Sequence, residues 1–231
     1  MIKSAFFEFR KNYLKKLFLS LLIPTVIIFI KSFDPIMTFE FVQIFMLLFS
    51  FFIFLYFISI ISTNEFFLKT SKFVYTGLNL RKEVLIKKFL IMIFANIFTF
   101  LFFTLSTTLL RIIVYNISFD MMTILKNLVV FLFLGIFIST FNLFVSYITL
   151  NAIMSIIINL LLFFPEFYQI LKMIPSKNKV ISTIIYNIPF DISFMGFITL
   201  KYSFNNMLIL LVFSTIFIIF SLIILEKRDL K

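Results

Sequence analysis

Hydrophobic residues lie in long continuous runs along this chain, without the alternation typical of strands. A helix needs about 20 mostly apolar residues to cross the ~30 Å hydrocarbon core of a bilayer. Unbroken runs favour such helices over the alternating strands of a membrane barrel. The pattern predicts an all-α, polytopic membrane protein with six transmembrane helices in a single domain, 1–231. The expected spans are 17–33, 41–62, 89–110, 128–149, 152–171 and 207–225.

Composition excludes a soluble globular protein. Hydrophobic residues make up 62% of the 231 positions, only 13% are charged, and the mean hydropathy is +1.16. A soluble domain typically carries about 25% charged residues, because its surface must be solvated. The chain contains no His and no Cys, which removes the commonest general base and any thiolate chemistry. We therefore expect a membrane protein that is not an enzyme and that binds no metal or cofactor itself.

The basic residues predict the orientation of the spans. Lys and Arg accumulate on the cytoplasmic side of membrane proteins. Placing the N-terminus inside assigns 14 of the 21 Lys and Arg residues to the inner side and 7 to the outer side. Both termini are therefore expected in the cytoplasm. The net charge of +11 has the same topological explanation, and no nucleic-acid partner is expected.

Apolar residues ahead of the first span recur at helical spacing. Phe6, Phe9 and Tyr13 belong to this set, and Arg10 lies between them. The pattern predicts an amphipathic helix in the cytoplasmic interface, with the apolar side in lipid and the charges in water. The alternative is a frayed basic tail.

The segment between the second and third spans, 63–88, has the pattern of two short helices at a bend. One apolar stripe repeats at helical spacing, Gly77 suits a helix end, and Asn79 can cap the next helix, which runs through Arg81 into the third span. The expected functional residues of this segment are Glu65, Phe66, Lys69, Phe73, Gly77, Leu78, Asn79 and Arg81. The segment is either an interfacial connector or an element that receives force from a cytoplasmic motor.

Together these features resemble the membrane subunits of ABC-2 type transporters. The likeness rests on Phe7-Glu8-Phe9-Arg10-Lys11 through Leu22-Ile23-Pro24, on Glu65 to Lys88, on the six spans, and on the outer loop 172–206. In this family a Glu follows the second span, a turn carries a small residue or Pro and then a basic residue, and a Lys begins the third span. Glu65, Gly77, Arg81 and Lys88 stand at those places, and the frequent Pro is missing from Thr76-Gly77-Leu78.

The resemblance implies a half-transporter in a bacterial cell membrane. Two permease subunits, identical or paired with a sister, would sit on two copies of a cytoplasmic ABC ATPase. ATP and Mg²⁺ would bind that partner, because this chain has only three Gly residues and cannot form a G-x-x-x-x-G-K-[ST] loop. The substrate it suggests is an amphipathic or antimicrobial peptide, as for the lantibiotic-immunity and phenol-soluble modulin exporters of Gram-positive bacteria. Lipid, drug or polysaccharide export stays open, as does a non-transport scaffold or helper subunit.

Polar residues inside the spans are candidates for lining a pathway, since lipid disfavours them. The candidates are Gln43, Asn96, Asn142 and Asn159. Hydrogen bonds between helices are the alternative explanation.

Three acidic residues near the outer span ends, Glu40, Glu166 and Asp191, are expected to be solvated carboxylates. The apolar part of the loop 172–206 predicts a short helix that dips back into the outer leaflet.

Overall fold

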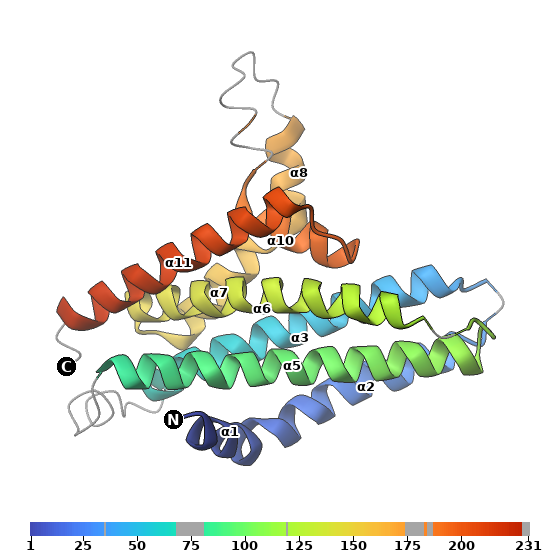
Figure 1. Ribbon diagram of the computed structural model, residues 1–231, viewed down its shortest axis with the longest axis horizontal. Coiled ribbons are helices and arrows are strands. Elements are labelled where there is room, and N and C mark those ends of the chain that lie inside the picture. Colours follow the sequence, from blue (N-terminus) through green and yellow to red (C-terminus); the bar gives the residue numbers. More distant parts are fainter. Residues whose placement is uncertain (35, 68–80, 119, 174–182, 184–186, 228–231) are drawn as a thin grey trace.

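The computed structural model describes residues 1–34, 36–67, 81–118, 120–173, 183 and 187–227 (Figure 1). Over these ranges the chain is helical and forms no strand, which confirms the all-α prediction for the part described. The helices are α1 (Ile2–Phe9), the π-helical η1 (Arg10–Leu14), α2 (Lys15–Lys31), α3 (Phe39–Phe67), α5 (Arg81–Ile113), α6 (Met121–Thr149), α7 (Ala152–Leu162), α8 (Pro165–Met173), α10 (Pro189–Ile198) and α11 (Phe204–Lys227).

Five helical stretches are long and apolar enough to cross a membrane, as expected of a membrane protein. They are Ile2–Lys31, Phe39–Asn64, Arg81–Ile113, Met121–Thr149 and Phe204–Lys227. Five of the six predicted spans lie largely within these stretches. Two of the helices extend well beyond the prediction, α5 by eight residues at its start and α6 by seven (89 − 81 and 128 − 121).

The fifth predicted span, 152–171, is wrong as a continuous helix. The structure divides it into α7 and α8, which are 11 and 9 residues long. Pro165 begins α8, and proline both lacks an N–H donor and disfavours helical geometry in the residue before it. Phe163 is fully buried at the resulting corner, from which α8 leaves at a steep angle to α6 (Figure 1).

The N-terminal helix packs on protein more closely than the sequence suggested. Ala5, Phe9, Tyr13 and Leu17 form a buried stripe along α1, η1 and the start of α2. The ring of Phe9 lies 6.4 Å from the rings of two α5 phenylalanines, centroid to centroid. Since residues four apart drift around an α-helix, the wider turn of η1 keeps these four positions on the buried side of the helix. Phe9 and Tyr13, expected in lipid, are therefore buried, whereas Phe6 is 51% exposed and Arg10 is exposed.

The start of the chain and the end of α11 lie at the same end of the bundle (Figure 1). Two contacts establish this arrangement. Glu8 of α1 forms an ion pair with Lys87, in the second turn of α5. Arg81, the first residue of α5, donates to the carbonyl of Leu225 in the last turn of α11. We call this end of the bundle the terminal end, and the other the distal end.

Aromatic packing holds the short helices to the long ones. Phe51 of α3 lies 5.2 Å from Phe194 and 5.6 Å from Phe197, both on α10. Phe141 of α6 lies 4.7 Å from Phe190, also on α10, ring centroid to centroid. The Phe51–Phe194 and Phe141–Phe190 pairs are edge-to-face, and such pairs each add about 0.5–1.5 kcal/mol beyond area burial. The short helix predicted in the loop 172–206 is thus present as α10, and it is packed into the core.

Candidate functional site

Four basic residues at the start of α5 connect this helix to four others. We call Arg81, Lys82, Lys87 and Lys88 the α5 base. The Arg81 guanidinium donates to the Leu225 carbonyl at 2.7 Å, and Lys82 pairs with Glu226 at 2.8 Å. Both partners lie on α11, so the start of α5 is fixed to the end of the last span.

The remaining two lysines of the α5 base reach α1 and α3. Lys87 pairs with Glu8 at 2.6 Å. Lys88 is only 3% exposed, and its ammonium donates to the Ser62 carbonyl at 2.7 Å. The same ammonium lies 5.8 Å from the centre of the Tyr147 ring of α6. A buried ammonium is tolerated only with such partners, so Lys88 joins α5 to α3 and α6 in the interior.

The predicted coupling residues lie mostly outside the described residues. Lys69, Phe73, Gly77, Leu78 and Asn79 fall in 68–80, and the side chains of Glu65 and Phe66, in the last turn of α3, are not described either. Arg81 is placed as predicted, in a helix that continues into the third span. The structure therefore describes the backbone at both ends of the segment 63–88, and of the predicted coupling residues it describes the side-chain contacts of Arg81 alone.

Two of the four candidate pathway residues meet in the interior. The amide of Asn159 (α7) donates to Ser59 (α3) at 2.9 Å and to the Asn142 (α6) side-chain oxygen at 2.5 Å. The Ser59 hydroxyl donates to the same oxygen at 2.9 Å. All three side chains are buried, so this Asn cluster joins α3, α6 and α7 by hydrogen bonds. The sequence did not single out Ser59, because serine in an apolar helix commonly bonds its own backbone.

The other two candidates lie elsewhere. Asn96 of α5 donates to the Phe131 carbonyl of α6 at 2.8 Å, beside Gly135, where a Cβ atom would lie 2.2 Å from the Asn96 amide nitrogen. Gln43 lines a pocket at the distal end of the bundle. The four residues therefore occupy three separate places in the bundle.

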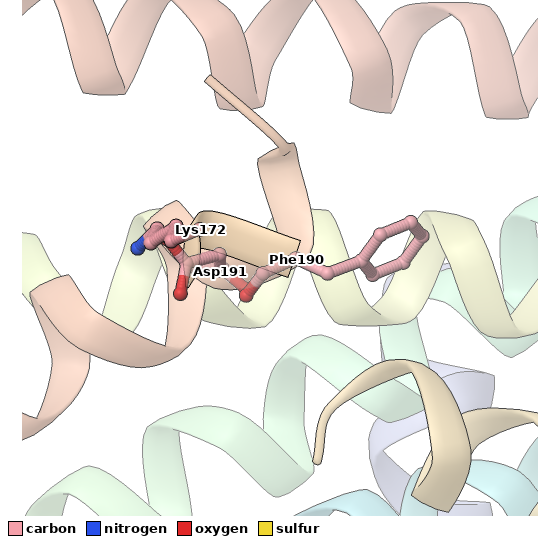
Figure 2. Close-up of polar contacts among 4 residues, drawn as sticks. Lys172, Phe190 and Asp191 are labelled. Atoms are coloured by element: carbon pink, nitrogen blue, oxygen red, sulfur yellow. The ribbon is translucent and has the colours of Figure 1, made fainter. Parts of the chain in front are cut away.

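The corner between α8 and α10 contains an ion pair that the sequence did not predict. Lys172 donates to a carboxylate oxygen of Asp191, and Figure 2 shows the two side chains beside each other. Asp191 was expected to be solvated and is instead buried, since the approach of α8 covers it and supplies the countercharge. Glu40 and Glu166 are exposed, as expected.

A second contact fixes the other end of α10. The Tyr202 hydroxyl donates to the Ser193 carbonyl at 2.6 Å. Its ring lies against Gly196, where a Cβ atom would be only 1.9 Å from a ring carbon. The absence of a side chain at Gly196 thus lets the chain turn closely from α10 into α11.

No protein-family model matches this sequence, and no curated protein matches it either. The likeness to ABC-2 subunits rests on the sequence motifs themselves, and the assignment to that family is a proposal.

Proposed function

We propose that this chain is the membrane subunit of an ATP-driven exporter of the ABC-2 type. It would form part of the translocation pathway and receive motion from a separate ATPase. The observation that carries the proposal is the α5 base, which bonds to α1, α3 and α11 directly after the segment 68–80. In this proposal that segment seats on the ATPase.

The contacts of the α5 base are suited to distributing a displacement. Hydrogen bonds to charged groups are worth about 1.5–3 kcal/mol each where they are shielded from water. Lys88 is buried and Arg81 is partly buried, whereas the Lys82–Glu226 pair is exposed and contributes less. A shift of the connection between α3 and α5 would therefore move four helices together. A simple connector needs no such set of contacts.

The chain path supports six crossings with both termini in the cytoplasm. The start of the chain and the end of α11 lie at the terminal end, and α6 also ends there, near Lys88. If α11 crosses the membrane, residues 150–203 must return the chain to the distal side. In this proposal α7 and α8 make that sixth crossing as a broken helix.

The assembly that we propose contains two permease subunits, identical or paired with a sister, and two copies of the ATPase in a bacterial cell membrane. ATP and Mg²⁺ would bind the ATPase. An amphipathic or antimicrobial peptide is the proposed substrate, and a lipid, drug or polysaccharide is the alternative. A scaffold or helper subunit is the competing function, and it needs no ATPase.

Affinity capture in mild detergent, with mass spectrometry of the captured proteins, tests the proposal. We expect a stoichiometric ATPase whose activity is retained in the complex. Arg81→Gln should preserve membrane insertion and ATPase capture and lower the substrate exported per ATP hydrolysed. Arg10→Gln is the matched control, because Arg10 is exposed and has no partner among the described residues. Capture of the protein without any ATPase would refute the transporter proposal and favour the scaffold function.

A further inference from the structure

The distal end of the bundle encloses a polar pocket of about 270 Å³. Its walls come from the first turn of α3, the last turns of α5 and the start of α6, which contribute Glu40, Arg111 and Asp120. These positions lie at the ends of three candidate spans, where hydrocarbon gives way to lipid head groups.

Arg111 lacks an acceptor in this pocket. Its Nε atom is buried without a hydrogen-bond partner, and its guanidinium makes no ion pair or side-chain hydrogen bond with any described residue. The ring of Phe39 lies with its centroid 5.9 Å away, and the Asp120 carboxylate is close enough to interact with the guanidinium electrostatically without bonding to it. A guanidinium carries five N–H donors and stays charged. Only its Nε atom is shielded from water, and Arg111 as a whole is half-buried. Its terminal N–H groups are therefore available to an acceptor that enters the pocket.

Two further polar groups of the pocket have no partner in the described part of the chain. The Thr104 hydroxyl is buried and unbonded. Asn127 is 4% exposed, lines the pocket, and makes no side-chain hydrogen bond with a described residue. Buried polar groups in folded proteins nearly always have partners. Their convergence on one pocket with Arg111 indicates a polar ligand.

The charges of the pocket exclude a simple anion. Glu40 and Asp120 also line it, so two carboxylates face one guanidinium. Asp120 accepts hydrogen bonds from the Thr123 hydroxyl and the Met122 N–H, and these bonds hold the pKa of its carboxyl below the usual range. Its two oxygens have about four acceptor positions, so some remain available. A free anion would be repelled by these carboxylates, whereas an anion that carries its own ammonium would find partners for both charges.

We propose that this pocket binds a zwitterionic group in which a primary ammonium is tethered to a phosphate, as in the phosphoethanolamine head group of a membrane lipid. Arg111 takes the phosphate, and Glu40 and Asp120 take the ammonium. Asn127 hydrogen-bonds one of the remaining oxygens. A primary ammonium offers three N–H donors, which a quaternary choline lacks. The site is independent of the proposed transport function, since it lies at the opposite end of the bundle from the α5 base.

Native mass spectrometry of the full-length protein in mild detergent tests this site. The probes are dioleoyl phosphatidylethanolamine, phosphatidylcholine and phosphatidylglycerol, with soluble glycerophosphoethanolamine as a fourth. We expect the ethanolamine lipid to bind at least tenfold more tightly than the other two lipids. Arg111→Gln should weaken that binding at least tenfold, and Glu40→Gln should remove the preference over choline. Lys126→Gln is the control, because Lys126 is exposed near the start of α6 and does not line the pocket.

The soluble probe distinguishes the sources of the group. Saturable binding of glycerophosphoethanolamine that Arg111→Gln abolishes would support the same recognition with a soluble ligand, and binding confined to the lipid would support a lipid site. Equal binding of all three lipids, unchanged in both pocket variants, would overturn the proposal. Glu40 is exposed, so Glu40→Gln keeps the test decisive if Arg111→Gln does not fold.

Discussion

The contact between Gly135 and Asn96 allows a quantitative test of the α5–α6 packing. In Gly135→Ala the new Cβ atom would lie 2.2 Å from the Asn96 amide nitrogen and 2.3 Å from its Cγ atom. Asn96 is 1% exposed and is held by its hydrogen bond to the Phe131 carbonyl. The methyl group therefore forces the amide out of that bond while the amide remains buried.

The expected cost follows from two contributions. Overpacking in a dense interior costs about 1–3 kcal/mol, and a buried polar group without a partner costs about 1–3 kcal/mol. Side-chain hydrogen bonds in membrane proteins average only about 0.6 kcal/mol, which favours the lower part of the sum. We expect Gly135→Ala to lower the free energy of unfolding by about 2–4 kcal/mol.

Asn96→Ala should cost less, about 1–2 kcal/mol. The Phe131 carbonyl keeps its intrahelical partner, and the substitution also removes the Asn96 side-chain oxygen, which has no hydrogen-bond partner. In the double variant the methyl group introduced at position 135 enters the vacated space, so the cost should resemble that of Asn96→Ala alone. The interaction energy of the two substitutions would then equal the cost of Gly135→Ala alone, about 2–4 kcal/mol in magnitude.

Unfolding in mixed micelles by titration with sodium dodecyl sulfate, followed by far-ultraviolet circular dichroism, measures these free energies. All four proteins of the cycle should be compared in the same detergent. If the two single costs add in the double variant to within about 0.5 kcal/mol, then Asn96 does not occupy the space beside Gly135 and the reasoning is refuted.

Three further predictions concern the N-cap of α6 and the two contacts that hold α10. Asp120 caps the start of α6, and Asp120→Asn should lower the thermal midpoint at neutral pH. The pKa of the Asp120 carboxyl is depressed in the folded protein, so its charge stabilises the fold above about pH 4 and this contribution is lost as the carboxyl is protonated. The difference between the two proteins should therefore shrink below that pH, and a difference independent of pH would contradict the prediction. Tyr202→Phe should cost about 1 kcal/mol in detergent unfolding, since it removes a buried hydrogen bond, whereas the exposed Tyr56→Phe should cost nothing measurable. Asp191→Asn should destabilise the fold by about 1–3 kcal/mol, and adding Lys172→Met should recover part of that loss; no recovery would mean that the ion pair is not the cause.

The long helices could be predicted from the sequence because their signal is local. Runs such as 41–62 and 128–149 exceed the length that a bilayer requires, whatever surrounds them. The break at Pro165 also had a local signal, since proline seldom continues a helix, but the apolar run concealed it. The burial of Phe9 and Tyr13 had none, because lipid and a neighbouring helix select the same apolar residues.

The polar sites were only partly predictable, for a different reason. The cost of polar groups in lipid identified Asn142 and Asn159 as special, but their meeting at Ser59 depends on how three helices pack. Arg111 could be counted only as one basic residue of an outer loop. Its lack of an acceptor becomes visible when all its neighbours are known.

The brevity of α7 bears on the order in which the chain can be assembled. Eleven residues span about 16 Å as a helix, roughly half of a hydrocarbon core, so α7 is too short to be inserted as an independent segment. Its Asn159 side chain is also costly in lipid until Ser59 and Asn142 are present to bond it. If α7 belongs to the proposed sixth crossing, the earlier helices would act as a template for it during biogenesis. A chain ending after α6 should still insert, whereas a fragment beginning at Asn151 should leave α7 outside the bilayer.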